Sequence, residues 1–187
     1  MSFTLSIEEK IILLRTARIA ILERLGLPAE TFPEPTPPLT ANCGAFVSLH
    51  IDGNLRGCIG YITAHKPLVE TVKEMACSAA FSDPRFSPLE SGEVNDTEIE
   101  ISVLSPFTAV KNIADIEVGV HGIMVRRGMR SGLLLPQVAT EYGWDREEFI
   151  SHTCRKAGLP PNDWRKSGLE IEIFSAAVFS EKDVGLR

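Results

Sequence analysis

The sequence predicts a mixed α+β protein with a mostly antiparallel sheet and flanking helices. Several segments alternate apolar with polar residues, which is typical of half-buried strands, and others repeat apolar residues at three- and four-residue steps, which is typical of amphipathic helices. The strands outnumber the helices and do not alternate strictly with them. This order favours an antiparallel sheet over a parallel, doubly wound one.

Length and composition indicate an ordinary globular protein. The chain of 187 residues fits a single domain over residues 1–187, which can include a small lobe folded into it. A net charge of -6 argues against a broad nucleic-acid or anionic-membrane surface. No apolar run approaches a membrane span and no secretory signal begins the chain, so we expect a cytoplasmic location. The four scattered cysteines predict reduced thiols, and no cluster predicts a metal site.

The first elements are a helix and a proline-rich connector. Residues 6–25 carry the helical repeat, Ser6 and Glu9 have the spacing of a capping box, and Gly26 supplies the stop. Residues 31–38 then contain four prolines, which impose an extended conformation.

Residues 44–52 and 55–61 read as two strands joined by turn chemistry at Asp52-Gly53-Asn54, which predicts a hairpin. A three-residue loop keeps one face apolar, whereas a two-residue loop would set Asp52 against Leu55 and mix the faces, so the first register is favoured. It pairs Ile51 with Leu55, Leu49 with Gly57 and Val47 with Ile59 on the apolar face, and His50 with Arg56 and Ser48 with Cys58 on the other.

The remaining elements follow from the same signals. A proline begins residues 67–81 and suits the first position of a helix, after which residues 82–89 form an irregular loop. Asp145 and Glu148 repeat the capping-box spacing at the start of another helix, which ends at Gly158. Further strands are expected at residues 98–104, 123–127, 133–135 and 170–173, with a turn at 128–132 between the second and third.

The hexapeptide at residues 55–60, Leu-Arg-Gly-Cys-Ile-Gly, is the sharpest candidate site. Gly57 and Gly60 remove side chains from a strand, which allows either close packing or a ligand contact. Arg56 and Cys58 are two residues apart and project from one face of an extended strand. A guanidinium beside a thiol favours the nucleophilic thiolate. The alternative is that Cys58 is a small buried apolar residue.

The same hexapeptide matches the signature of the AMMECR family, and further landmarks follow in the family's order at residues 79–86, 99–102, 132–139 and 143–145. The resemblance covers residues 44–181. It implies a compact α+β unit in which a larger and a smaller part meet at a cleft, with Arg56 and Cys58 as the site. Microbial members are associated with Memo-type and radical SAM proteins, which are therefore the expected partners, while the family implies no particular activity or cofactor.

Residues outside the hexapeptide are also candidates for the site. His50 and His65 are candidate bases toward Cys58, and Glu100, near Glu98 on one strand, is a candidate acid or base. Each of these also fits an ordinary solvated position. Asp83 and Arg85 flank a proline in a loop and either bind a ligand or brace the loop.

Two functional hypotheses remain open. The first is a catalytic or small-molecule-binding site centred on Arg56 and Cys58; the second is a non-catalytic adaptor that presents this surface to a partner protein. A basic run at residues 126–130 suits a phosphate-bearing ligand or an exposed hairpin tip, and the acidic total disfavours nucleic-acid binding through it.

Overall fold

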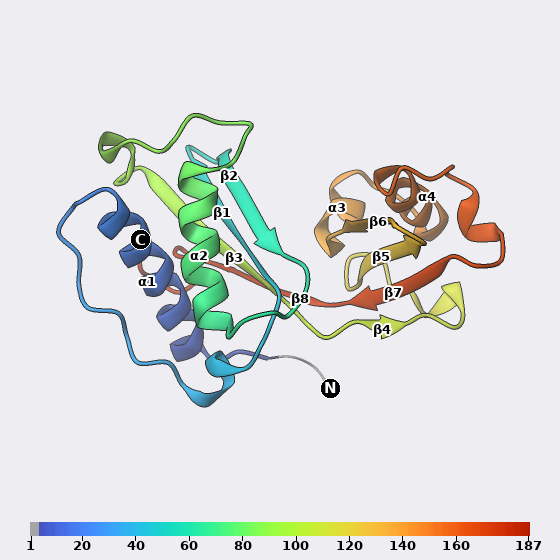
Figure 1. Ribbon diagram of the computed structural model, residues 1–187, viewed down its shortest axis with the longest axis horizontal. Helices are drawn as coiled ribbons and strands as arrows, with labels where there is room; N and C mark the ends of the chain where they lie inside the picture. Colours follow the sequence, from blue (N-terminus) through green and yellow to red (C-terminus); the bar gives the residue numbers. More distant parts are fainter. Residues whose placement is uncertain (1–3) are drawn as a thin grey trace. The chain divides into compact units, whose positions relative to one another are not determined.

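A computed structural model describes residues 4–187 and confirms the α+β fold class. The chain forms two compact units: unit 1 contains the residues up to Leu104 together with Ala177–Arg187, and unit 2 is Ser105–Ala176 (Figure 1). Each unit holds one four-stranded sheet within this described part, and the strand pairings with an assigned register are antiparallel. None of the described helices is both long and apolar enough to cross a membrane.

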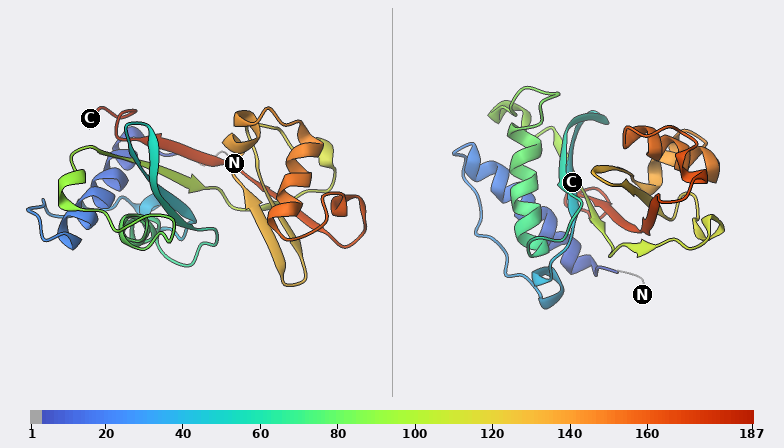
Figure 2. Two further views of the ribbon diagram at one scale, coloured as in Figure 1. Left: turned by 90° about the horizontal axis from the view of Figure 1, so that it is seen from above. Right: turned by 45° about the vertical axis from the view of Figure 1, so that its right-hand side comes forward.

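Unit 1 is a sheet covered by helices on one face (Figures 1 and 2). Its strand order is β2-β1-β3-β8. The strands are β1 (Ala45–Ile51), β2 (Asn54–Tyr61), β3 (Thr97–Leu104) and β8 (Ala176–Ser180), and the helices are α1 (Ile7–Arg24) and α2 (Leu68–Phe81). Alternate residues of β1 and β3, such as Val47, Leu49, Ile99 and Ile101, are fully buried in one core with the helices. The opposite face, called the open face below, carries no described helix of unit 1.

The helix boundaries of unit 1 follow the local sequence. The Ser6 hydroxyl accepts the Glu9 N–H at 3.2 Å, and the Glu9 carboxylate accepts the Ser6 N–H at 2.8 Å, which confirms the predicted capping box. Pro67 is the N-cap of α2, one position before the predicted place. The proline-rich connector is irregular until a short 3-10 helix at Pro37–Thr40.

The hairpin of β1 and β2 corrects the predicted register. Its turn has two residues, Asp52 and Gly53, with φ of 51° and 76°. Positive φ at both positions gives a two-residue turn a twist that matches the right-handed twist of the flanking strands. A bulge then inserts Arg56 into β2 and restores the pairing beyond it. The predicted pairs Val47–Ile59, Leu49–Gly57 and Ser48–Cys58 are confirmed, whereas Ile51–Leu55 and His50–Arg56 are wrong, because Ile51 faces Asn54 and His50 faces Leu55.

Unit 2 is a smaller sheet with two helices. Its strand order is β4-β7-β5-β6. The elements are β4 (Thr108–Ala109), β5 (Gly122–Arg127), β6 (Arg130–Leu134), β7 (Glu170–Phe174), α3 (Pro136–Glu141) and α4 (Arg146–Lys156). Its core includes Ile123, Val125, Phe149, Ile150 and Cys154. The predicted strands and the capping box of α4 are confirmed, although β6 begins at Arg130 and shortens the predicted turn to two residues.

Several short elements have no counterpart in the prediction. They are α3, β4 and β8, and 3-10 helices at Ser91–Glu93, Ile113–Asp115 and Asp163–Arg165, besides the one at Pro37–Thr40. A segment of two to six residues shows too little of a hydrophobic period to be recognised, and its conformation depends on the neighbours that it pairs with.

Candidate functional site

Cys58 lies on the open face of the unit 1 sheet, in one row with two polar side chains. The row runs across three strands, because Cys58 pairs with Ser48 on β1 and Ser48 pairs with Glu100 on β3. Side chains directly opposite each other in antiparallel strands have Cβ atoms about 5 Å apart. The Ser48 hydroxyl donates a hydrogen bond to the Cys58 sulfur at 3.2 Å, and Cys58 is partly exposed. A thiol, a hydroxyl and a carboxylate therefore share one accessible surface.

The next row along the open face contains His50 opposite Glu98. Both line a hollow of about 370 Å³, together with Asp52, Asn95, Lys182 and Arg187 among others. Lys182 forms an ion pair with Glu98 and, through that hydrogen bond, lowers the pKa of the carboxyl group. His50 is thus a neighbour of the Cys58 row, but it faces Glu98 and not Arg56.

His65 lies after β2 in an exposed segment. Its ring nitrogen is 2.6 Å from the Thr63 hydroxyl, a contact within the same loop. Both His65 and Cys58 are in the described part of the chain, and no hydrogen bond joins them. The structure therefore separates this candidate base from the others.

Arg56 attaches β2 to the segment that follows α2. Its guanidinium donates two hydrogen bonds to the Glu93 carboxylate, at 2.8 and 2.9 Å, and one to the Ser87 carbonyl at 2.9 Å. The hydrogen bond to Glu93 raises the pKa of Arg56 and lowers that of Glu93. The Arg56 side chain is only 15% exposed. Both residues of the expected pair are described, and no hydrogen bond connects the Arg56 guanidinium with the Cys58 sulfur.

Asp83 and Arg85 hold the backbone of Cys58 at the outer edge of β2. The Asp83 carboxylate is buried and accepts hydrogen bonds from the Cys58 N–H at 2.9 Å and from the Arg85 guanidinium at 2.7 and 3.0 Å. Arg85 also donates to the Cys58 carbonyl at 3.3 Å. These bonds, those from Arg85 first, hold the pKa of Asp83 well below its usual range. Both backbone polar groups at this edge are thereby satisfied.

Arg85 is the cation that the structure places at Cys58. Its side chain is 54% exposed, so the guanidinium is accessible while it remains bonded to Asp83. The hydrogen bond to Asp83 is the main reason that the pKa of Arg85 is raised. Arg85, and not Arg56, is therefore the arginine that contacts Cys58, and it does so through the backbone carbonyl.

The two glycines of the hexapeptide allow close approach by the protein itself. A Cβ atom on Gly57 would lie 2.2 Å from the Ala79 carbonyl oxygen, in the backbone of α2. A Cβ atom on Gly60 would lie 2.3 Å from the Phe46 ring. Packing of a helix and of an aromatic ring against β2 thus accounts for the absence of both side chains.

Of the other three cysteines, Cys43 and Cys154 are buried, whereas Cys77 is partly exposed and its thiol donates to the Ala20 carbonyl at 3.5 Å. Cys43 is buried, its thiol donates to the Leu104 carbonyl at 3.0 Å, and burial raises its pKa to about 11. Burial also raises the pKa of Cys77 and of Cys154. Within residues 4–187, no group of three or more His, Cys, Asp or Glu side chains is arranged to hold a metal ion.

The basic run of unit 2 is paired within that unit. Arg127 Nε lies 2.9 Å from the buried Asp163 carboxylate, and Arg130 donates to the Gly158 carbonyl at 3.0 Å. Arg126 has weaker contacts of 3.9 to 4.0 Å with two glutamates of β7. Much of this positive charge is therefore neutralised locally.

Sequence reasoning missed two residues of the site. Ser48 was placed opposite Cys58 by the predicted register, and that placement was the available signal that its hydroxyl would contact the sulfur. Glu93 gave no such signal, because it is 37 positions from Arg56 along the chain. Only the folded loop after α2 brings these two together.

Comparison with known proteins identifies the family. The AMMECR1 family model matches residues 14–179. A protein of Methanopyrus kandleri is 48% identical, with 96% of this chain and 91% of that protein covered, and one of Methanothermobacter thermautotrophicus is 46% identical, with 95% and 96% covered. The crystal structure of an uncharacterised protein from Pyrococcus horikoshii matches with a TM-score of 0.83 and 38% identity, over 95% of this chain and 94% of that one. The chain therefore belongs to the AMMECR1 family.

Proposed function

We propose that the open face of unit 1 binds a small molecule and uses Cys58 as a reactive thiol. The observation that carries this proposal is the 3.2 Å hydrogen bond from the Ser48 hydroxyl to the Cys58 sulfur, at a partly exposed position in one row with Glu100. Partial exposure distinguishes Cys58 from the buried Cys43 and Cys154. Cys77 is also partly exposed, but burial raises its pKa, and its thiol donates to a backbone carbonyl and does not accept from a hydroxyl.

The neighbours of Cys58 suit a nucleophilic role. A hydroxyl that donates to sulfur and a nearby guanidinium both favour the thiolate over the thiol. Ser48 supplies the first, and we assign the second to Arg85, which donates to the backbone carbonyl of Cys58. In this role Glu100 takes up the proton that the Cys58 thiol loses, and the thiolate adds to a carbonyl carbon of the ligand. The sulfur–carbon bond forms as the carbonyl π bond breaks, and the electron pair moves to the carbonyl oxygen. Asp83 acts as a positioning residue, because it holds the Cys58 N–H and the Arg85 guanidinium together.

The test is competitive alkylation of the folded protein. At about pH 8, near the ordinary pKa of a free thiol, limiting iodoacetamide followed by peptide mass spectrometry should modify Cys58 first. Cys43 and Cys154 should react only after unfolding, because both are buried. Protection of Cys58 until denaturation would refute the proposal.

Matched arginine variants show which cation supports the thiol. Arg85→Gln should slow alkylation of Cys58, because it removes the accessible guanidinium beside it. Arg56→Gln is the control and should change the rate much less, since its charge is already paired with Glu93. An equal effect of both substitutions would contradict the assignment of Arg85.

A second candidate function is a non-catalytic adaptor for a Memo-type or radical SAM protein. The observation that favours it is that Arg56, Gly57 and Gly60 all make structural contacts within the protein. These contacts account for most of the hexapeptide, so no catalytic role is required to explain it. In a pull-down with a purified partner, Arg85→Glu should then abolish binding while Cys58→Ser leaves it intact. Loss of binding with Cys58→Ser would favour the thiol-based function instead.

A further inference from the structure

The proposed reaction moves negative charge from the Cys58 sulfur to the carbonyl oxygen of the ligand. An oxygen anion of this kind is stabilised by hydrogen-bond donors about 2.7–3.1 Å away, and losing one such donor slows enzymatic reactions by roughly 10² to 10³. Backbone N–H groups commonly supply these donors. The Cys58 N–H is already engaged, because it donates to the Asp83 carboxylate at 2.9 Å. The donor must therefore come from another group near the sulfur.

The two arginines near Cys58 are bound to other groups. The Arg56 guanidinium donates to the Glu93 carboxylate at 2.8 and 2.9 Å. Arg85 donates to the Asp83 carboxylate and to the backbone carbonyl of Cys58. Among residues 4–187, neither arginine has a hydrogen bond with the Cys58 sulfur. Both guanidinium groups thus hold β2 in place, and the oxygen anion needs a different donor.

Ser48 carries the donor that points at the sulfur. Its hydroxyl donates to the Cys58 sulfur at 3.2 Å, and a hydroxyl has one proton to donate. Ser48 lies on β1, which β2 and β3 flank on both sides, and its side chain is half-buried. The sheet therefore fixes the position of this hydroxyl and shields it partly from water.

The same hydroxyl can follow the negative charge from sulfur to oxygen. In the adduct, the carbonyl oxygen is two bonds from the sulfur, so a donor in contact with the sulfur reaches the oxygen by rotation of its own side chain. Sulfur that is bonded to carbon is a weak acceptor, whereas the oxygen anion is a strong one. The hydrogen bond therefore becomes stronger as the reaction proceeds, which is the condition for lowering its barrier.

We propose that Ser48 is a catalytic residue that stabilises the oxygen anion, and that the ligand is an activated ester or a thioester. This inference rests on the proposed function of Cys58. The thiolate forms the sulfur–carbon bond, and the carbonyl π electrons move to the oxygen. The π bond then forms again, and the leaving group departs with the electrons of its bond to carbon. Glu100, in the same row as Ser48, returns the proton of the thiol to a basic leaving group. The product is Cys58 that carries the acyl group as a thioester.

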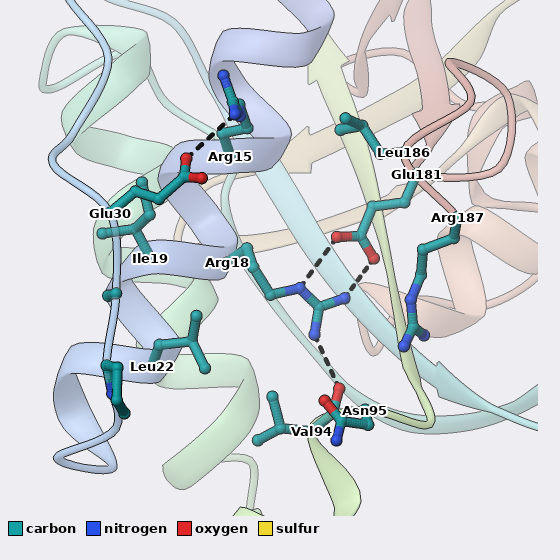
Figure 3. A pocket seen from close by; sticks show the side chains of 12 residues that line it. Arg15, Arg18, Ile19, Leu22, Glu30, Val94, Asn95, Glu181, Leu186 and Arg187 are labelled. Atoms are coloured by element: carbon teal, nitrogen blue, oxygen red, sulfur yellow. Dashed lines mark hydrogen bonds and ion pairs between the residues drawn. The ribbon is translucent and has the colours of Figure 1, made fainter.

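A hollow of about 540 Å³ elsewhere in unit 1 lacks the groups for this reaction. It is lined by α1, by residues 28–30 and 94–95, and by the C-terminal segment, and Arg18 donates to the Glu181 carboxylate at 3.0 Å within it (Figure 3). None of the described residues that line it is a cysteine, serine, threonine, lysine or histidine. An ester bound there would meet no thiol, hydroxyl, amine or imidazole, so the row of Cys58 is the better place for acyl transfer.

The test compares two reactions of the same thiolate in the full chain. Iodoacetamide alkylates the sulfur by displacing iodide and forms no oxygen anion, whereas p-nitrophenyl acetate acylates the sulfur through such an anion. Both rate constants are measured at one pH, and peptide mass spectrometry verifies that each label is on Cys58. The amount of thiolate affects both reactions. The ratio of the acylation to the alkylation rate constant therefore isolates the donor to the oxygen.

Substitutions of Ser48 should change this ratio according to whether they keep the hydroxyl. Ser48→Ala should lower it about tenfold or more, through loss of the donor. Ser48→Thr should stay within about threefold of the unsubstituted protein, a margin that covers small changes in thiolate nucleophilicity. Ser48→Val is the matched control for Ser48→Thr, because the two differ only by a methyl group in place of the hydroxyl. It should lower the ratio as Ser48→Ala does, and this pair serves if the smaller side chain of alanine disturbs the sheet.

The outcomes separate this inference from the proposed function. A ratio within about threefold of the unsubstituted protein in both Ser48→Ala and Ser48→Val overturns the role of Ser48. Alkylation of Cys58 without acylation by p-nitrophenyl acetate overturns the inference too, although Cys58 is then still a reactive thiol. Protection of Cys58 from both reagents refutes the proposed function and the inference together.

Discussion

Replacing Gly57 with alanine tests whether the hexapeptide owes its glycine to helix packing. The added Cβ atom would lie 2.2 Å from the Ala79 carbonyl oxygen, whereas an ordinary carbon–oxygen contact is about 3.3 Å. The obstacle is backbone, so α2 and β2 must separate by roughly 1 Å. Overpacking of this kind costs about 1–3 kcal/mol, and we expect the upper end because neither partner is a flexible side chain.

The assay is urea unfolding followed by circular dichroism, with Gly92→Ala as the control. A Cβ atom on Gly92 would meet nothing within 4 Å, and Gly92 has no positive φ, so its substitution should change the free energy of unfolding little. Gly57→Ala should lower that free energy by about 3 kcal/mol, or the melting temperature by roughly 6 to 12 °C. If Gly57→Ala lies within about 1 kcal/mol of the control, the packing explanation is wrong and a ligand contact at Gly57 regains support.

Three further substitutions test local contacts. Ser6→Ala should cost about 1 kcal/mol of unfolding free energy through loss of the N-cap, measured by urea denaturation, and no loss would contradict the capping role. In a double-mutant cycle, Arg56→Gln and Glu93→Gln should show a coupling of about 1 kcal/mol, and additive effects would disprove the ion pair. Asp83→Asn should destabilise the protein by about 2 kcal/mol near neutral pH. Because the folded state depresses the pKa of Asp83, this difference should persist down to the ordinary value of 3.8 and shrink as the pH falls further; a gap that stays constant in acid would refute the assignment.

Much of the fold could be predicted because its signals are local. The capping box at Ser6 and Glu9 joins groups three residues apart, and the burial alternation of β1 appears directly as a period of two. The existence of the hairpin followed from turn residues at Asp52 and Gly53. The bulge could not be foreseen from local sequence. The turn has two residues, and one extra residue in β2 is then needed to keep the apolar side chains of both strands on the buried face.

The candidate site was predicted only in part. The sequence by itself placed Cys58 opposite Ser48, since antiparallel pairing and alternation determine which side chains share a face. Tertiary structure decided that Glu93 binds Arg56, that Arg85 reaches Cys58 and that Arg187 lines a pocket with α1. The spacing of capping residues and the period of apolar residues each involve only a few consecutive positions, so the order of residues along the chain reveals them. Contacts between distant residues depend on how loops close and helices pack, which no local pattern specifies.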